Sequence, residues 1–139
     1  MQRIFIVFVF VFFFVAGASA QTNNKVVAAS IARGKTVYLQ RCMVCHQADG
    51  GGVPKLNAPL DGSSAVNGTD VAKLIKYIVK GFNDRVEIDG ELYSNAMPAA
   101  ADLTDQQIAD VLTFIRSNWS NKAGPVTTLQ VKQTRSKLK

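Results

Sequence analysis

The sequence predicts an all-α domain in which three main helices are joined by long loops and one small β-hairpin. Apolar side chains recur at helical spacing over residues 71–82 and again over residues 108–119, as in helices with one buried face. Residues 28–41 have the composition of a third helix. Glycine and proline interrupt the chain between these segments, so we expect loops there rather than further helices.

Residues 1–20 are predicted to be a signal peptide rather than part of the folded domain. Arg3 lies in a short polar start, residues 4–16 form an apolar run, and Ala18-Ser19-Ala20 fits the small-residue pattern of a cleavage site. The run is shorter than the roughly 20 residues that cross a bilayer, which makes an uncleaved membrane anchor the weaker alternative. We therefore expect a domain over residues 21–121 that is exported to the periplasm.

The predicted first helix contains an unusual glycine. Ile31, Val37 and Tyr38 give this helix an apolar side, and Gly34 lies among them. A glycine inside a helix costs about 1 kcal/mol relative to alanine. We therefore expect another backbone to approach the helix closely at Gly34.

A C-x-x-C-H motif follows this helix, as Cys42-Met43-Val44-Cys45-His46. Two thiols at this spacing followed by an imidazole are typical of a c-type haem attachment site, where the cysteines form thioethers and the histidine ligates the iron. His46 is the one histidine in the chain, so a second histidine ligand is excluded. We predict one haem c bound through Cys42, Cys45 and His46.

Two other kinds of site use the same residue types. A thioredoxin-like redox pair requires a βαβ context, whereas here a helix precedes the motif and a glycine-rich loop follows it. A structural zinc site requires four ligands, and the chain offers one histidine and two cysteines as soft or borderline donors. Haem attachment is the prediction, with disulfide chemistry and zinc as its alternatives.

A second helix and a hairpin are predicted in the middle of the chain. Thr69 or Asp70 can cap a second helix that begins near Val71, and Gly81 can end it. Two short runs then flank Asp89-Gly90, a dipeptide that favours a hairpin with a type I′ turn.

The hairpin leads to Met97, which is the predicted sixth ligand of the iron. Of the three methionines, Met1 lies in the predicted signal peptide, and Met43 lies between the two cysteines and cannot reach the opposite haem face. Pro98 follows Met97 and biases it away from helical backbone, so we expect Met97 in a loop that can be aimed at the iron. The alternative is that Met97 only fills a gap in the core.

The last predicted helix begins at a capping box formed by Thr104 and Gln107. One stripe of this helix is apolar, with Phe114 at its flank, and must be buried. We expect it to pack against the first helix around Gly34, and a haem would supply the rest of the apolar centre. The stripe consists of Ile108, Val111, Leu112, Ile115 and Trp119.

The net charge of +6 is concentrated near the C-terminus. Residues 122–139 contain basic side chains and no acidic ones, and we predict a basic tail outside the domain. Such a tail either steers the protein to an acidic redox partner or an anionic membrane surface, or is simply solvated. Interleaved aromatics and phosphate-binding glycine loops are missing from the sequence, so nucleic-acid binding has no support.

These features together resemble the class I monohaem cytochromes c. Gly34 and Tyr38 resemble the family's glycine and aromatic residue on the first helix, and Phe114 resembles the aromatic they meet on the last. Pro59-Leu60 resembles the family's Pro-Leu pair. The resemblance implies that the carbonyl of Pro59 accepts a hydrogen bond from His46 and thereby orients this ligand.

Part of the sequence is similar to the cytochrome c domains that serve membrane-bound dehydrogenases, copper nitrite reductases and haem-copper oxidases. The chain departs from them near residue 65, where they usually carry a tryptophan close to a haem propionate and this chain has Ala65-Val66. The propionate contacts are therefore open. The similar segments are Val86-x-Ile88-x-Gly90-x-x-Tyr93, Met97-Pro98, Leu103-Thr104-Asp105, Ile108-Ala109, residues 117–121, and Val126-Thr127, Val131 and Arg135 in the tail.

The resemblance implies an electron carrier rather than an enzyme. If His46 and Met97 occupy both axial positions, the iron has no free site for a substrate, and one-electron exchange remains. The expected partners are a redox donor and acceptor, one of them a membrane-bound or periplasmic oxidoreductase. Two alternatives are a permanent haem subunit of a larger dehydrogenase or oxidase, and a five-coordinate haem sensor or peroxidase-like enzyme in which Met97 does not bind.

Overall fold

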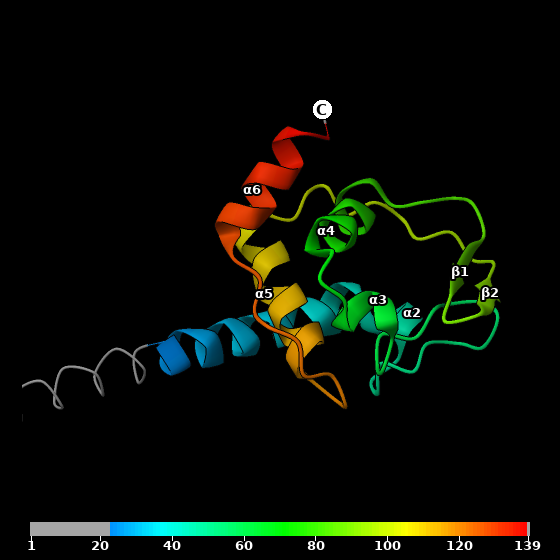
Figure 1. Cartoon of the computed structure of the whole chain (residues 1–139), viewed down its shortest axis with the longest axis horizontal. Helices are drawn as coiled ribbons and strands as arrows, with labels where there is room; N and C mark the ends of the chain where they lie inside the picture. The colour runs from blue at the N-terminus through cyan, green and yellow to red at the C-terminus, as the bar shows by residue number, and fades with distance from the viewer. Residues whose placement is uncertain (1–22, 139) are drawn as a thin grey trace, which may run out of the picture.

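The computed structural model describes residues 23–138 of the chain, and the predicted signal peptide lies outside this range. Within it, no helix is both long and apolar enough to cross a membrane. A long N-terminal helix covers residues 23–41. The further elements are α2 (Met43–His46), α3 (Ser64–Asn67), α4 (Val71–Lys80), β1 (Val86–Ile88), β2 (Glu91–Tyr93), α5 (Asp105–Ser117) and α6 (Thr128–Ser136) (Figure 1).

Helix α5 lies at the centre of the fold and is buried over most of its length. Its Thr104–Gln107 capping box is present, because the Thr104 hydroxyl accepts the Gln107 N–H and the Gln107 side chain accepts the Thr104 N–H. Ile108 and Val111 are fully buried. The predicted apolar stripe is confirmed from Ile108 to Ile115, where all four of its residues belong to the core.

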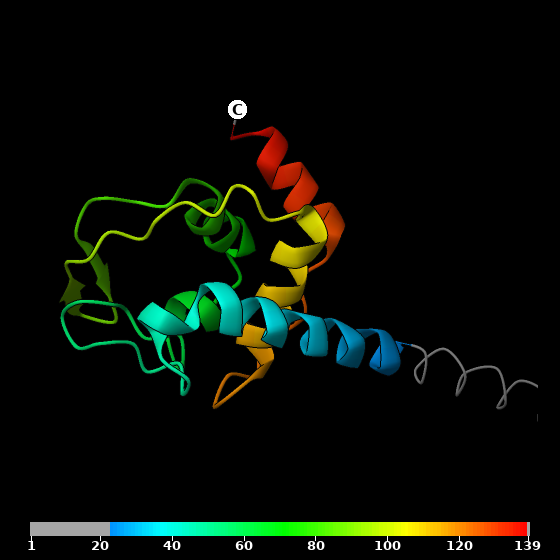
Figure 2. The same ribbon diagram turned by 180° about the vertical axis from the view of Figure 1, so that it is seen from behind.

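The N-terminal helix crosses α5, as Figure 2 shows from behind, and Gly34 lies where the two backbones come close together. A Cβ atom at Gly34 would overlap the carbonyl oxygen of Asp110 and lie 2.9 Å from Cβ of Phe114. Tyr38 lies one turn further on, with its ring centroid 5.4 Å from that of Phe114. The predicted close approach at Gly34 is therefore confirmed, and only a residue without a side chain allows it.

Replacing Gly34 by alanine is expected to destabilise the fold by about 1–3 kcal/mol or more, because the two helix backbones must move apart. Gly124→Ala is the matched control, since nothing lies within 4 Å of a Cβ built there. Its effect should stay within about 0.5 kcal/mol. Urea unfolding followed by circular dichroism measures both. Equal midpoints for the two variants would contradict the close packing.

The predicted second helix and hairpin are also present. The Asp70 side chain accepts the Lys73 N–H at the start of α4, and Gly81 follows its last residue with a φ of 62°. Strands β1 and β2 pair antiparallel, with Val86 opposite Tyr93. Asp89 and Gly90 between them have φ values of 56° and 81°. Positive φ at both central residues is what a type I′ turn requires.

The prediction that Trp119 belongs to the apolar stripe of α5 is wrong. Helix α5 ends at Ser117, and Trp119 has a φ of 53°, which turns the chain back toward the first helix. Its ring packs edge-on against Tyr38 and Phe114, with centroids 5.4 and 5.7 Å away. Gly50 lies directly against the same ring, which leaves no room for a side chain there.

The largest difference from the sequence prediction is at the C-terminus, where residues 122–138 are part of the domain and not a tail outside it. Helix α6 packs on α4 and α5, and makes a fourth main helix (Figure 1). Val131 is fully buried and Val126 is 4% exposed. The predicted boundary at residue 121 is therefore wrong. Thr127 and Gln130 form a second capping box, a local signal from which α6 could have been found.

Arg135 fastens α6 to the segment between Met97 and α5. Its guanidinium donates to the carbonyl oxygens of Ala101 and Leu103, at 3.1 and 2.7 Å. A second nitrogen of the same group lies 3.1 Å from the Asp105 carboxylate. One of the residues that made the tail look basic is therefore a structural contact.

Buried polar groups hold the loops around α5, and sequence patterns did not indicate them. Asn121 is fully buried. Its side chain donates to the carbonyls of Leu60 and Ile115 and accepts the Gly62 N–H. Arg116 is 6% exposed and donates to the carbonyls of Val66, Gly68 and Gly124. Both side chains donate hydrogen bonds to backbone carbonyls that no helix or strand satisfies.

The Asp110 carboxylate joins the N-terminal helix to α5. It accepts two hydrogen bonds from Arg33, at 2.7 and 2.8 Å, and one each from Ser30 and Gln106. Burial by itself would raise the pKa of Asp110, but these hydrogen bonds outweigh burial and hold its pKa below the ordinary value. The ionised form of Asp110 therefore stabilises the fold.

Asp110→Asn is expected to lower the free energy of unfolding at pH 7 by roughly 1.5–3 kcal/mol, the range for hydrogen bonds to a charged group. Because the folded pKa is depressed, this stabilisation is complete above about pH 4 and is lost as pH falls further. Urea midpoints of the wild type and the variant should therefore converge as the pH falls below about 4. The exposed Asp102 forms an ion pair with the exposed Arg41, so Asp102→Asn should cost much less at pH 7. A constant difference at every pH would contradict this account.

Candidate haem site

One cavity brings together all five predicted site residues, Cys42, Cys45, His46, Pro59 and Met97. Its volume is about 290 Å³, close to the lower end of the range of small-molecule sites, roughly 300–1,000 Å³. Residues far apart in the sequence line it, and most of their side chains are apolar. The apolar lining includes Leu60, Val66, Leu74, Ile78, Phe82, Ile88, Leu103, Val111, Leu112 and Ile115.

The cysteine side of the cavity is built by the short helix α2. Its first turn continues from the N-terminal helix, since the Cys42 N–H donates to the carbonyl of Tyr38 and the His46 N–H donates to the carbonyl of Cys42. This places Cys42, Cys45 and His46 on one turn of backbone. Both thiols are free and partly buried. Burial raises the pKa of Cys42 to about 11, so its thiol is protonated at neutral pH.

The imidazole of His46 is held by a backbone carbonyl. His46 Nδ1 lies 2.9 Å from the carbonyl oxygen of Ala58. A carbonyl only accepts, so Nδ1 carries the proton and the lone pair of Nε2 is free to bind a metal. Burial lowers the pKa of His46, although the bond to Ala58 acts in the opposite direction. The neutral form is therefore favoured, which is the form that ligates iron.

The prediction that the Pro59 carbonyl accepts this hydrogen bond is therefore wrong, because the acceptor is the carbonyl of Ala58, one residue earlier. The loop from Gly50 to Asp61 is closed by two N–H groups, those of Leu60 and Asp61, that both donate to the carbonyl of Gly50. In this conformation the Ala58 carbonyl points to the imidazole, while Pro59 contributes to the lining of the cavity. The alternation of carbonyl directions along the loop decides which residue accepts, and sequence motifs do not specify it.

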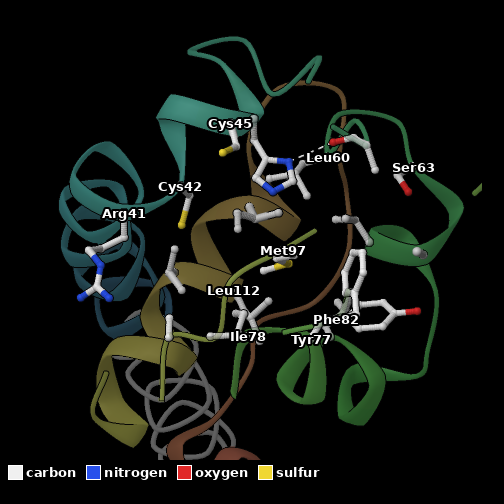
Figure 3. Close-up of a pocket in the computed structure, with 18 of the residues that line it drawn as sticks. Arg41, Cys42, Cys45, Leu60, Ser63, Tyr77, Ile78, Phe82, Met97 and Leu112 are labelled. Atoms are coloured by element: carbon white, nitrogen blue, oxygen red, sulfur yellow. Dashed lines mark hydrogen bonds between the residues drawn. The ribbon is translucent and has the colours of Figure 1, made fainter. Parts of the chain in front are cut away.

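Met97 reaches the cavity from a rigidly held loop. The N–H of Met97 donates to the carbonyl of Phe82 at 2.9 Å, and the N–H of Phe82 donates back to Met97 at 3.0 Å. The Ala100 N–H donates to the carbonyl of Ile78. Gly81 lies so close to the Met97 carbonyl that a Cβ would overlap it. Figure 3 shows the Met97 side chain within the cavity, as expected for a loop methionine aimed at a ligand.

The surroundings of the cysteines differ from those that a zinc site or a thioredoxin-like redox pair requires. Among residues 23–138, no three side chains of His, Cys, Asp or Glu are grouped so that they could hold a metal ion. The element before the cysteines is a helix, and the two strands found in the described part of the chain form a separate hairpin. By contrast, two free thiols, an imidazole with Nε2 available, a thioether and apolar walls are the set of groups that suits a covalently bound haem.

Comparison with known proteins agrees with this chemistry. The family model for cytochrome c matches residues 31–119. Cytochrome c-552 of Thermus thermophilus is 33% identical over 121 residues, which cover 79% of each chain. The cytochrome c subunit of the quinone alcohol dehydrogenase of Gluconacetobacter polyoxogenes is 38% identical over 73% of this chain, and the gluconate 2-dehydrogenase cytochrome c subunit of Pantoea cypripedii is 35% identical over 68%.

The chain spans only 22% of the length of these two dehydrogenase subunits. The relation to them therefore concerns one segment of each, whereas the relation to the Thermus protein concerns most of both chains. The family match includes the C-x-x-C-H motif, the cavity and Met97. The chain belongs to the cytochrome c family, whose members transfer electrons through a covalently bound haem c.

Proposed function

We propose that the protein is an exported electron carrier whose haem iron is ligated by His46 and Met97. One observation supports this ligation most directly: the loop that carries Met97 is fastened to α4 so that the thioether lies in the same cavity as His46 and both cysteines. The haem supplies one-electron oxidation and reduction of its iron. His46 binds through Nε2 with Ala58 as its support, and the apolar walls exclude water.

Two axial side chains leave no position for a substrate, which favours electron transfer over the five-coordinate alternative. A thioether ligand also raises the reduction potential relative to a second imidazole. The five-coordinate sensor or peroxidase-like protein remains a competing hypothesis because it needs only His46. Binding of carbon monoxide by the reduced wild-type protein separates the two hypotheses, since a six-coordinate iron resists it.

We further propose that the redox partner is a membrane-bound or periplasmic oxidoreductase. The cytochrome subunits of alcohol, gluconate and fructose dehydrogenases among the relatives support this class of partner. The second candidate is a permanent subunit of such a complex, which the same relatives favour. Purification of untagged partners at high salt distinguishes the two, because a transient electrostatic complex dissociates when charges are screened.

Weak association with an anionic membrane surface is a further part of this proposal. Lys132 is exposed on α6, Lys137 is exposed directly after the helix, and Lys122 is exposed before it. Arg135 is not available in the same way, since it is engaged by Asp105 and two carbonyls. Co-sedimentation with anionic and neutral vesicles at two salt concentrations tests this association.

A pyridine haemochrome spectrum of the exported protein tests covalent attachment. The wild type should keep its haem through acid-acetone extraction, and the Cys42→Ala/Cys45→Ala double variant should release it, because no thioether remains. Detection of the mature N-terminus by mass spectrometry tests the predicted cleavage after Ala20. A colourless product from a host that matures c-type cytochromes would contradict the haem proposal.

A further inference from the structure

A buried hydroxyl without a partner lies in the wall of the cavity. Ser63 is 1% exposed, and its Oγ makes no hydrogen bond to any residue in the part of the chain that the structure describes. Although Ser63 occupies the N-cap position of α3, its side chain does not cap the helix. Buried hydroxyls are normally hydrogen-bonded, because an unsatisfied one destabilises the fold. Since Ser63 lines the cavity, a group bound there can provide the missing partner.

The polar groups of the cavity lie at two opposite sides. Figure 3 shows Arg41, Cys42 and Cys45 on one side, and Ser63 and Tyr77 across the cavity from them. Arg41 already has a partner, because it donates two hydrogen bonds to Asp102 at 2.7 and 2.9 Å. Ser63 and Tyr77 carry the hydroxyl groups of the cavity lining. A bound group can therefore find hydroxyl donors on this side of the cavity.

The chemistry of the haem decides which of its edges faces Ser63. The cysteines bind the two vinyl-bearing pyrroles, so the other two pyrroles, which carry the propionates, point away from Cys42 and Cys45. The propionate edge must then lie on the side of Ser63 and Tyr77. A carboxylate brought to a buried site needs donors, and a hydroxyl is a suitable one.

We propose that Ser63 donates a hydrogen bond from Oγ to a haem propionate, with the hydroxyl of Tyr77 at the same end of the cavity. The neighbouring Ala65 and Val66 offer no side-chain donor to this edge. The proposal relies on covalent attachment at Cys42 and Cys45, and it does not depend on Met97. The similar cytochrome c domains usually carry a tryptophan near residue 65, close to a haem propionate, and this chain has Ala65-Val66 there. Ser63 would supply the contact instead.

Asp89 is the competing partner for Ser63. The Asp89 carboxylate accepts the Ser64 N–H at 3.1 Å. Its pKa is lowered mainly by Ser64 and to a smaller extent by Ser63, yet Ser63 Oγ makes no hydrogen bond to it. A test of the proposal must therefore distinguish a propionate from the Asp89 side chain as the acceptor of the Ser63 proton.

Isotope-edited infrared spectroscopy makes this distinction. Growth on δ-aminolevulinic acid with ¹³C in its carboxyl carbon labels the haem only at its two propionate carboxylates, so Asp89 is not detected. The labelled propionate stretch in Ser63→Ala should shift toward that of a carboxylate without a hydroxyl donor. The reduction potential should also fall, because a less compensated negative charge stabilises the oxidised iron.

The controls use residues of the same kind. Ser63→Thr keeps the hydroxyl and should retain the wild-type band and potential. Ser64→Ala removes the next hydroxyl along the chain, which is exposed and does not line the cavity, and should leave the labelled band unchanged. Tyr77→Phe removes only the second hydroxyl and should give a smaller shift. If Ser63→Ala does not accumulate, Ser63→Cys, with nearly the same shape and a weak donor, carries the same test.

Two results would overturn the proposal. One is a haem-loaded Ser63→Ala or Ser63→Cys protein whose labelled propionate band and potential match the wild type. The other is an Asp89→Asn protein that shows the same changes in band and potential as Ser63→Ala, which would trace those changes to Asp89 and its surroundings and not to a Ser63–propionate bond. The pyridine haemochrome spectrum of each variant reports covalent attachment separately, so a failure of haem binding is not confused with loss of the propionate contact.

Discussion

Met97→Ala is expected to leave the haem covalently attached while removing the proposed sixth ligand of its iron. The band of the oxidised protein that arises from charge transfer between the thioether and the iron should disappear, and the reduced variant should bind carbon monoxide. Its reduction potential should fall, because a thioether favours the reduced iron. Optical spectra with and without carbon monoxide and a redox titration measure these three changes.

Met43→Ala is the matched control for this experiment. Met43 lies between the anchoring cysteines, in α2, and packs against the core. Its removal should lower stability slightly and leave the charge-transfer band intact. A band that persists in Met97→Ala would refute the assignment of Met97 as ligand. A wild type without the band that binds carbon monoxide readily would favour the five-coordinate alternative.

Val131→Asp is expected to have the largest effect on stability, a loss of about 4–5 kcal/mol or failure to fold. Val131 is fully buried where α6 meets α4 and α5, and an aspartate there would be a carboxylate with no partner. Urea unfolding followed by circular dichroism measures the loss. If α6 were a dispensable tail, the variant would unfold at the same midpoint as the wild type.

Leu129→Asp provides the control on the same helix. Leu129 is 61% exposed, so a charged side chain there stays in water and should change stability by less than about 0.5 kcal/mol. The two variants carry the same change in charge within one turn of α6. A difference between them therefore reports burial of Val131 and not the charge of the helix.

Release of α6 should also affect the proposed iron ligand. Arg135 holds the carbonyls of Ala101 and Leu103, which lie between Met97 and α5. Without these contacts the Met97 loop keeps its bonds to Phe82 and Ile78 but loses its support on the α5 side. In Val131→Asp we therefore expect the charge-transfer band to be lost at a lower urea concentration than the helical signal.

Much of the fold and the site could be predicted because the signals are local. The C-x-x-C-H motif places two thiols and an imidazole within one turn, whatever surrounds it. Thr104 with Gln107, and Asp89 with Gly90, determine a helix start and a turn through bonds to near neighbours. Gly34 could be recognised as a point of close helix packing, because the free-energy cost of a glycine inside a helix has to be offset by a contact that only glycine allows.

The errors concern features that depend on distant contacts. Val131 and Arg135 looked like part of a basic tail because helix α6 has only one buried apolar residue of its own. Trp119 continues the spacing of α5, but its packing on Tyr38 draws it off the helix. Asn121 and Arg116 are polar in sequence and buried in the structure, because loop carbonyls brought to them from far along the chain satisfy them.

The sequence by itself indicated the haem-binding motif, three of the four main helices and Met97 as the candidate sixth ligand, since spacing and residue type define these without knowledge of the fold. The tertiary structure alone decided that Ala58 supports His46, that α6 closes the core and that Ser63 is buried at the edge opposite the cysteines. The physical reason is that carbonyl direction, burial and unsatisfied hydrogen bonds are properties of groups brought together by folding. They are not carried by any single segment of the chain.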